Sequence, residues 1–344
     1  MRTFWDSIGE ERQNVVIYGT GNGADRLLDR LEEEGIRPAG VFASDGFVRE
    51  RTFRGYRVMS LREAVSSFGE DMLILVGFGS DRPEAVSVMK ELCRDMRVAS
   101  PRIPLYDSAF MDSAFVPLME KEFSGVSKIL SDDISLRTLE AIRDYRITAD
   151  LRFLFGCEEY EDGTWRDLLG LTGTEDYVDI GAYRGDTIDR FISFAGSCSS
   201  VTAAEPDPKN FEKLREHTKD MENVRLFRVF ASDSSGTAEF MSGSGRGSSR
   251  GKGTAVETRT VDSMLDGSPA SLIKIDAEGS EEKVIEGCRE TILRWRPKIK
   301  TAVYHRADDI WRIPAQILGI RDDYKVYLRH YPAFPDWNTE MIFV

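Results

Sequence analysis

The feature that most constrains this chain is a regular alternation of short apolar runs with amphipathic stretches, which begins at residue 177. Each apolar run has the length of a strand, and each amphipathic stretch has the apolar spacing of a helix. Strands that alternate with helices build a parallel sheet with helices on both faces. The sequence therefore predicts an α/β fold here, with strands in "YVDI", "SVTAAE", "VRLFRVF", "SLIKID", "KIKTAVYH", "KVYLRH" and "TEMIFV".

The preceding part of the chain predicts a smaller α/β unit. The run "NVVIY" ends in "GTGNG" and is followed by a helical pattern, and "MLILVGFG" has the composition of a buried strand. Amphipathic helical stretches then follow without a strong strand. We predict a small Rossmann-like α/β domain at 1–106, a helical connector at 107–171 and a larger α/β domain at 172–344. The Gly/Ser-rich stretch 243–253 predicts a mobile hairpin loop.

Charge and composition limit the partners and the compartment. The formal net charge of -13 argues against general affinity for nucleic acid or an anionic membrane, because both require a basic face. Apolar runs fall short of the roughly 20 residues of a membrane span, and the first residues lack an apolar signal core. The cysteines show no metal-binding spacing. We expect a cytoplasmic protein with reduced thiols at Cys93, Cys157, Cys198 and Cys288.

Polar residues follow the predicted strands at the points where the strands end. Ligands of open α/β sheets bind beyond the carboxyl ends of the strands. Converging carboxylates disfavour a pyrophosphate, but they suit a ligand with an ammonium group and ribose hydroxyls, such as S-adenosylmethionine. Glycines in the first turn allow the backbone to approach the amino-acid part of that ligand. The residues at these ends are Asp179, Glu205, Asp233, Asp276, His305 and His330.

Several blocks of the sequence resemble the FkbM-type methyltransferases. The blocks are "YVDIGAYRGDTIDRF", "AAEPDPKNFEKL", "TVDSMLDG", "LIKIDAEGSEEKVIEG" and "VYHRADDIWRIPAQIL", in the order and spacing of the family. The stretch "VVIYGTGNGADRLL" is similar to an N-terminal extension of some members. The resemblance implies a class I, seven-stranded, Rossmann-like methyltransferase domain, S-adenosylmethionine as donor, and usually O-methylation of a sugar or a natural-product hydroxyl.

The resemblance also implies roles for residues at matching positions. Tyr183 and Arg184 depart from the small or Asn-like residues common in the family, which puts the fine geometry of the first turn in question. The acceptor pocket has no matching residues, so the acceptor stays open. The implied contacts are the methionine moiety for Asp179, Gly181 and Gly185, the ribose for Glu205, the adenine for Asp207 and Asp233, and the sulfonium and acceptor for Asp276 and Glu278.

A hydroxyl acceptor benefits from a base in the transition state. His305 is the first candidate because a neutral imidazole accepts a proton near neutral pH, and Asp276 is the second. Structural roles compete with these assignments, since Asp179 also suits a helix cap and a histidine after a strand is often structural. Mixed oxygen and nitrogen ligands from Asp276, Glu278 and His305 would suit a divalent metal. Their spacing matches no fixed metal motif, so we expect no metal.

The "GTGNG" turn supports a competing hypothesis. It approximates a dinucleotide-binding fingerprint, with Asp45 near the place of a ribose-binding acid and Ala24 where the last glycine would stand. A nicotinamide-dependent oxidoreductase or a nucleotide-sugar-binding protein would use this turn, whereas a docking domain would need it only to begin a helix. A binding module that has lost catalysis is a third alternative. We expect a small-molecule acceptor, such as a sugar or glycan, as the partner.

Overall fold

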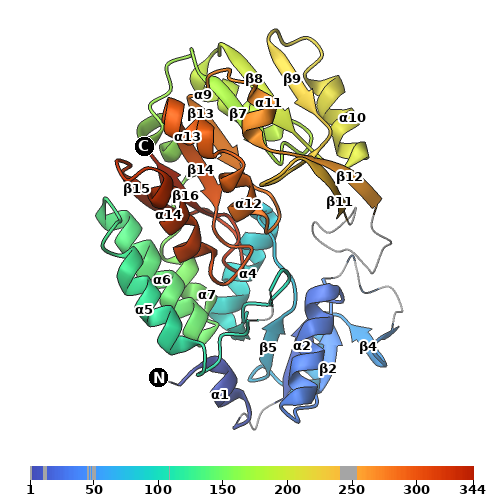
Figure 1. Cartoon of the computed structure of the whole chain (residues 1–344). Helices are drawn as coiled ribbons and strands as arrows, with labels where there is room; N and C mark the ends of the chain where they lie inside the picture. Colours follow the sequence, from blue (N-terminus) through green and yellow to red (C-terminus); the bar gives the residue numbers. More distant parts are fainter. Residues whose placement is uncertain are drawn as a thin grey trace. The chain divides into compact units, whose positions relative to one another are not determined.

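The computed structural model describes residues 2–10, 14–44, 46, 48, 52–107, 109–240 and 254–344. These residues form two compact units (Figure 1). The first unit comprises 1–128, 133–158 and 330–338, and the second comprises 129–132, 159–329 and 339–344. Most of the predicted helical connector groups with the first unit in this division. A short segment from near the end of the chain joins the first unit as well.

The first unit contains a six-stranded sheet in the order β3-β4-β2-β1-β5-β6. Its pairs are parallel except for β3 with β4. The strand "VVIY" is buried at all four positions, and the leucines of α2 lie against it in one apolar core. The elements are α1 Phe4–Ile8, β1 Val15–Tyr18, α2 Asn22–Glu33, β2 Gly40–Phe42, β3 Thr52–Phe53, β4 Tyr56–Met59, α3 Leu61–Phe68, β5 Leu73–Val76, α4 Pro83–Asp95, β6 Arg97–Ala99, α5 Val116–Val126, α6 Asp133–Thr148 and α7 Leu151–Phe155.

The second unit contains the predicted alternation of strands and helices. Two predicted strands that contain lysine, "LIKI" and "KIKTA", lie inside the sheet, because their apolar side chains are buried on both of its faces. The elements are α8 Glu161–Gly163, the π-helical turn η2 Thr164–Leu168, β7 Asp176–Ile180, α9 Asp186–Ala195, β8 Ser200–Ala204, α10 Pro208–His217, β9 Val224–Phe227, β10 Phe230–Ala231, β11 Gly236–Phe240, β12 Thr254–Arg259, α11 Val261–Leu265, β13 Leu272–Ile275, α12 Glu281–Glu286, α13 Arg289–Trp295, β14 Lys298–Ala302, α14 Asp309–Ile320, β15 Val326–His330 and β16 Thr339–Phe343.

The main sheet of the second unit has seven strands in the order β15-β16-β14-β13-β7-β8-β9. The pairs of β7 with β8 and β13, of β8 with β9 and of β13 with β14 are parallel. The expectation of a fully parallel sheet is wrong for β16, which runs antiparallel to β14. The cause is the link from its neighbour β15 through 331–338, which is shorter than the crossover that a parallel pair of strands requires.

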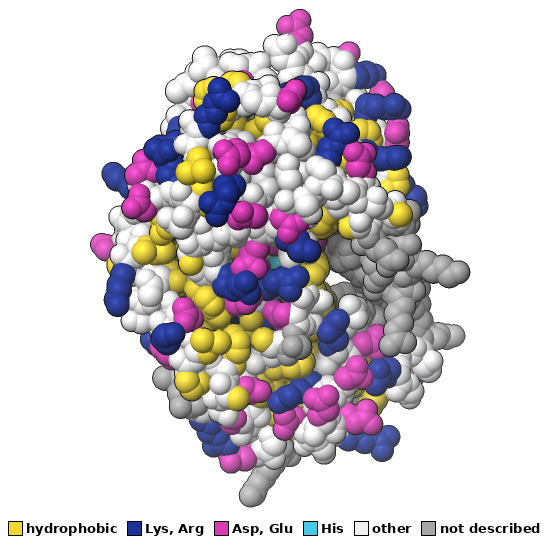
Figure 2. All heavy atoms as spheres, viewed as in Figure 1, with side chains coloured by type: hydrophobic (Ala, Val, Ile, Leu, Met, Phe, Trp, Pro, Cys, Tyr) yellow, Lys and Arg dark blue, Asp and Glu magenta, His cyan; other side chains and the backbone are white. Residues whose placement is uncertain are grey.

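A second, three-stranded sheet has the order β10-β12-β11, with β11 antiparallel to β12. The predicted hairpin loop at 243–253 lies outside the described residues. Among the described helices, none combines the length and the apolar character needed to cross a membrane. On the face of the molecule drawn in Figure 2, basic side chains are interspersed with acidic ones.

Candidate cofactor and acceptor site

The turn after β7 depends on its two glycines. Gly181 has a φ of 77°, and a Cβ at this position would lie 1.9 Å from the backbone oxygen of Asp276. Gly185 has a φ of 97°, and a Cβ there would lie 2.7 Å from the ring of His217. Because other residues are strained at positive φ and would clash at these places, the sequence requires glycine at both ends of the turn. The turn then delivers the chain into α9 with Gly185 as its N-cap.

Glu205 is fixed at this turn by two backbone hydrogen bonds. It follows β8 and is 6% exposed, and its Oε2 accepts the N–H of Tyr183 at 3.0 Å. Its Oε1 accepts the N–H of Asp207 at 2.9 Å. Burial is the main cause that raises the pKa of Glu205 to about 7. Each oxygen keeps a further lone pair, so the carboxylate is able to accept hydroxyl groups of a ligand.

Asp207 and Asp233 have local partners in the structure. The Asp207 carboxylate caps α10 by accepting the N–H groups of Lys209 at 2.9 Å and Asn210 at 3.0 Å. Asp233 is exposed after β10, and its Oδ1 accepts the hydroxyl of Ser234 at 3.0 Å. These contacts explain why an acid suits each position without a ligand. The adenine contacts implied for both residues stay predictions.

Asp179 is completely buried and forms an ion pair with Lys274. The Lys274 Nζ lies 3.3 Å from Asp179 Oδ1 and donates to the carbonyl of Gly181 at 3.0 Å. Burial raises the pKa of Asp179, and Lys274 opposes this effect. The ammonium group therefore ties β13 to both the strand and the glycine turn. The sequence interpretation missed Lys274, although a lysine between apolar residues in "LIKI" is a recognisable signal of a buried ion pair.

A second buried lysine on the sheet was also missed. Lys300 of β14 is 2% exposed at its side chain, and its Nζ pairs with Glu161 Oε1 at 3.1 Å and with a carboxylate oxygen of Glu340. The Nζ also lies 5.3 Å from the ring centroid of Trp165, whose Nε1 donates to Glu161 at 2.9 Å. Lys274 and Lys300 are register partners on adjacent strands. Two adjacent strands of the sheet thus carry buried lysines that are both paired with carboxylates.

An acid–histidine cluster lies at the ends of β13 and β14 and consists of Asp276, Glu278, Glu281 and His305. The His305 Nδ1 lies 2.9 Å from Glu281 Oε1. Its Nε2 lies 3.6 Å from both Asp276 Oδ1 and Glu278 Oε2. The structure therefore brings the two predicted catalytic residues together. It also adds Glu281, which the sequence interpretation did not single out.

The cluster changes the expected charge of His305. Burial disfavours the charged ring, but the carboxylates of Glu281, Asp276 and Glu278 outweigh burial and raise the pKa of His305 to about 10. A pKa this high favours the protonated ring at neutral pH, in contrast to the neutral imidazole on which the assignment of His305 as the base depends. The catalytic roles of His305 and Asp276 stay predictions.

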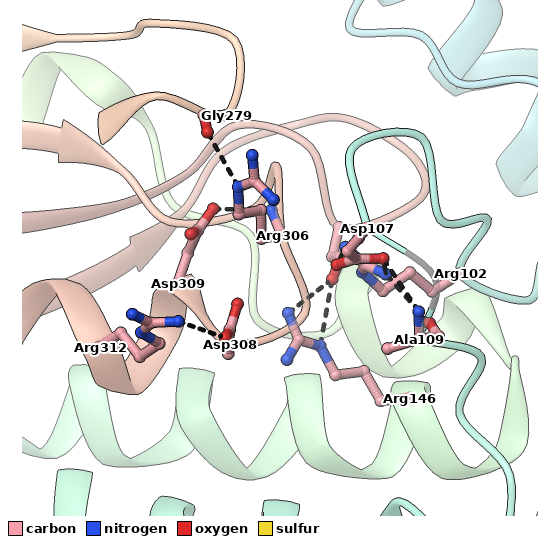
Figure 3. Close-up of polar contacts among 10 residues, drawn as sticks. Arg102, Asp107, Ala109, Arg146, Gly279, Arg306, Asp308, Asp309 and Arg312 are labelled. Atoms are coloured by element: carbon pink, nitrogen blue, oxygen red, sulfur yellow. Dashed lines mark hydrogen bonds and ion pairs between the residues drawn. The ribbon is translucent and has the colours of Figure 1, made fainter. Parts of the chain in front are cut away.

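The residues after His305 connect the cluster to α14. The N–H of Arg306 donates to Asp309 Oδ2 at 2.7 Å, and its Nε donates to the carbonyl of Gly279 at 2.9 Å (Figure 3). The Arg312 Nη1 lies 3.2 Å from Asp308 Oδ2. Asp309 is the first residue of α14, so its carboxylate closes the loop that carries His305. This loop is held at the β13 end by Arg306 and at the helix end by Asp309.

His330 and the "GTGNG" turn belong to the first unit. His330 is fully buried, forms a β-bridge with Glu158, and burial lowers the pKa of its ring to about 4. It is therefore not among the residues that the second unit brings to its site. Asp45, the acid proposed to bind a ribose in the first unit, lies outside the described residues.

The comparisons with known proteins agree with this geometry. Residues 179–341 match the family model described as the methyltransferase FkbM domain. These residues form a methyltransferase FkbM domain. The match runs from Asp179 through the acid–histidine cluster to Met341. The class I fold expected from the sequence is confirmed.

Two proteins illustrate what the FkbM domain is similar to. The 2-O-methyltransferase NoeI of Sinorhizobium fredii is 27% identical, and the match covers 38% of this chain and 65% of NoeI, just under two thirds. The crystal structure of methyltransferase FkbM from Methylobacillus flagellatus KT has a TM-score of 0.75 at 22% identity, over 96% of this chain and 90% of that one. The second match extends the likeness of fold beyond the FkbM domain to nearly the whole chain.

Proposed function

We propose that the chain transfers a methyl group from S-adenosylmethionine to a hydroxyl of a sugar or another polyhydroxylated small molecule. The observation that carries this proposal is the contact of the glycine turn with the start of the acid–histidine cluster. The N–H of Asp276 donates to the carbonyl of Ile180 at 3.0 Å, next to Gly181. A donor held at the turn therefore presents its methyl group beside side chains that bind an acceptor.

The donor side of the site uses the turn and the adjacent strand end. The backbone from Gly181 to Gly185 suits the methionine part of the donor, because the glycines at its two ends have no side chain to block a close approach. Glu205 suits the ribose, since a fixed carboxylate accepts two hydroxyl groups. Its place at the end of β8 adjoins the turn through the hydrogen bond from Tyr183. Asp179 acts through Lys274 and the Gly181 carbonyl, which makes the pair a support for the turn.

The acceptor side uses the exposed carboxylates of the cluster. The side chains of Asp276 and Glu278 are 37% and 50% exposed, whereas Glu281 is buried. Glu278 also has a positive φ of 51°, a strained conformation that is frequent at functional sites. Carboxylates accept hydrogen bonds from hydroxyl groups, which favours a polyhydroxylated acceptor. The relative NoeI, a 2-O-methyltransferase by name, supports a hydroxyl rather than a carbon acceptor.

The transfer is a single displacement. The acceptor oxygen forms a bond to the methyl carbon while the carbon–sulfur bond breaks, and the electron pair stays on sulfur to give the neutral thioether. The hydroxyl proton passes to a carboxylate of the cluster. Alignment of oxygen, carbon and sulfur supplies much of the rate.

Two measurements test the proposal. Calorimetric titration should show binding of S-adenosylhomocysteine, and titration with NAD should show none. Incubation with S-adenosylmethionine and a panel of mono- and oligosaccharides should then yield a product with one added methyl group by mass spectrometry. Binding of NAD without S-adenosylhomocysteine would refute the donor, and a product methylated on carbon or nitrogen would refute the hydroxyl acceptor.

A further inference from the structure

Three side chains from separate elements converge in the acid–histidine cluster. Asp276 follows β13, Glu281 begins α12 and His305 follows β14. One ligand atom from each residue lies within 4.8 Å of the others. Two ligands on opposite sides of an ion with bonds of about 2.1 Å are about 4.2 Å apart. Shifts of a few tenths of an ångström would therefore let these three atoms share one ion.

The charge balance of the cluster favours a cation. Three carboxylates, those of Asp276, Glu278 and Glu281, lie within 3.6 Å of a single imidazole. The side chains of Asp276 and Glu278 are 37% and 50% exposed, whereas Glu281 is 1% exposed and His305, which it faces, is 6% exposed. Three acids around one ring attract a cation, and a cation bound beside Glu281 would stabilise its buried carboxylate.

Glu281 supplies an independent observation. Its Oε1 accepts the N–H of Ala277 at 2.8 Å and lies beside His305, so the carboxylate is fixed in place. Its Oε2 is buried and accepts no hydrogen bond from the residues that the structure describes. A buried carboxylate oxygen without a donor needs an explanation, and an ion is one of the few that fit.

We propose that Asp276, Glu281 and His305 bind one divalent cation of the manganese type. Two carboxylate oxygens and one imidazole nitrogen are a donor set that first-row divalent ions accept, whereas carboxylates with few nitrogens disfavour soft copper(I). His305 binds the ion as the neutral ring, so its proton is released to the solvent when the ion binds. This site replaces the expectation from the sequence that no metal is bound. That expectation followed from spacing along the chain, which does not reveal that the three elements converge.

The role of the ion rests on the proposed function, while its binding does not. Held beside the presented methyl group, the ion would coordinate the acceptor hydroxyl and make its proton more acidic. The oxygen then forms its bond to the methyl carbon, the carbon–sulfur bond breaks toward sulfur, and the proton passes to the exposed carboxylate of Glu278. A vicinal diol would bind the ion through both oxygens, which would select sugar-like acceptors.

The test is a titration of the full chain, freed of metal by a chelator, with manganese(II) followed by electron paramagnetic resonance. We expect one site per chain. Glu281→Gln and Asp276→Asn should each weaken binding at least tenfold, since changing even a hydrogen-bonding partner of a metal ligand costs about 10–100-fold. The matched control is Glu282→Gln, because Glu282 adjoins Glu281 but pairs with Arg312 at 2.7 Å. Binding to the control should stay within about twofold of the native protein, as expected for a carboxylate outside the ligand set.

The result that overturns the proposal is the absence of saturable binding below about 1 mM, or equal affinity in the native protein and both ligand variants. If Glu281→Gln fails to fold because Glu281 is buried, Asp276→Asn still tests the site, because the Asp276 side chain is partly exposed. S-adenosylhomocysteine affinity is measured on the same samples. Methyl transfer that persists in excess chelator would refute the role of the ion in the reaction and leave the proposed function intact. Manganese binding without any binding of S-adenosylhomocysteine would support the metal site and refute the proposed function.

Discussion

The glycine turns after β1 and after β7 each join a parallel strand to a helix, and their surroundings differ. In the first unit the turn after β1 adjoins aromatic side chains, since Tyr18 stacks on Phe42 at 4.5 Å and meets Phe78 edge-on at 4.8 Å between ring centroids. A Cβ on Gly23 would lie 2.4 Å from the carbonyl oxygen of Gly77. In the second unit the turn after β7 adjoins Glu205, Lys274 and the acid–histidine cluster.

The comparison shows that a glycine turn by itself does not define a ligand site. Both turns use glycine for backbone reasons, namely positive φ or close packing against a neighbouring strand. The chemistry comes from residues at the ends of other strands, which are far away in the sequence. Packed aromatic rings at the first turn favour a structural role, whereas fixed carboxylates at the second favour ligand binding.

The largest expected difference between the two turns is the loss of folding stability when one glycine of each is replaced by alanine. Gly181→Ala should lower the free energy of unfolding by about 2–6 kcal/mol, the sum of backbone strain and of a clash with the Asp276 backbone. A Cβ in Gly19→Ala would approach the Phe78 side chain most closely, at 3.1 Å, with the Gly77 backbone at an ordinary 3.7 Å, and the change should cost about 1–3 kcal/mol for its positive φ. Denaturant unfolding measures both. Loss of S-adenosylhomocysteine binding in a folded Gly19→Ala variant would contradict the separation of the two turns.

Buried ion pairs give the next contrast. Lys274→Met leaves Asp179 buried without its cation and should cost about 3–5 kcal/mol. Arg146→Met in the first unit disrupts its pair with Asp336, whose Oδ2 lies 3.2 Å away, and should cost a similar amount. Lys274→Met alone should also weaken S-adenosylhomocysteine binding, by about tenfold or more, because Lys274 holds the turn. Equal cofactor affinity in the two folded variants would show that Lys274 is only structural.

The proposed contact of Glu205 with the ribose should contribute less free energy than the buried ion pairs. Glu205→Ala should weaken S-adenosylhomocysteine binding by about 1–3 kcal/mol, the range for hydrogen bonds to a charged acceptor. Asp45→Ala, at the competing acid of the first unit, should leave that affinity unchanged. Calorimetric titration of the two variants decides between the turns. A loss of affinity confined to Asp45→Ala would move the cofactor to the first unit.

The smallest effect is a pH dependence. The pKa of Glu205 is raised to about 7, so its carboxylate gains a proton as the pH falls through 7 and then accepts fewer ribose hydroxyls. S-adenosylhomocysteine affinity should therefore fall by up to roughly tenfold per unit below pH 7, about 1.4 kcal/mol. The folding stability of the cofactor-free protein should change in the opposite direction. The pKa of Glu205 is higher in the folded than in the unfolded protein, so this group stabilises the fold below its unfolded pKa, and that stability is lost as the pH rises through 7. In Glu205→Gln the pH dependence of affinity should vanish, and a persistent slope would assign it to another group.

Much of the second unit follows from local patterns. The helix expected in "DTIDRFISFA" is α9, and the seven expected strands are all present, because apolar periodicity and β-branched runs act over short distances. The acids at the ends of β7, β8 and β13 were predicted for the same reason. Glu281 and Lys274 were missed because their importance comes from burial, which local sequence does not reveal. The antiparallel β16 was missed because direction depends on the length of the link from β15.

The sequence by itself determined the alternation of strands and helices, the glycines of the first turn and the acids that follow the strands, since each depends on backbone geometry within a few residues. Only the tertiary structure decided which acids meet. Three elements bring Asp276, Glu281 and His305 together, and the carboxylates raise the pKa of the His305 ring. The grouping of 330–338 with the first unit was also a tertiary outcome. The physical reason is that burial and charge interactions act through space, whereas the patterns in a sequence record only neighbours along the chain.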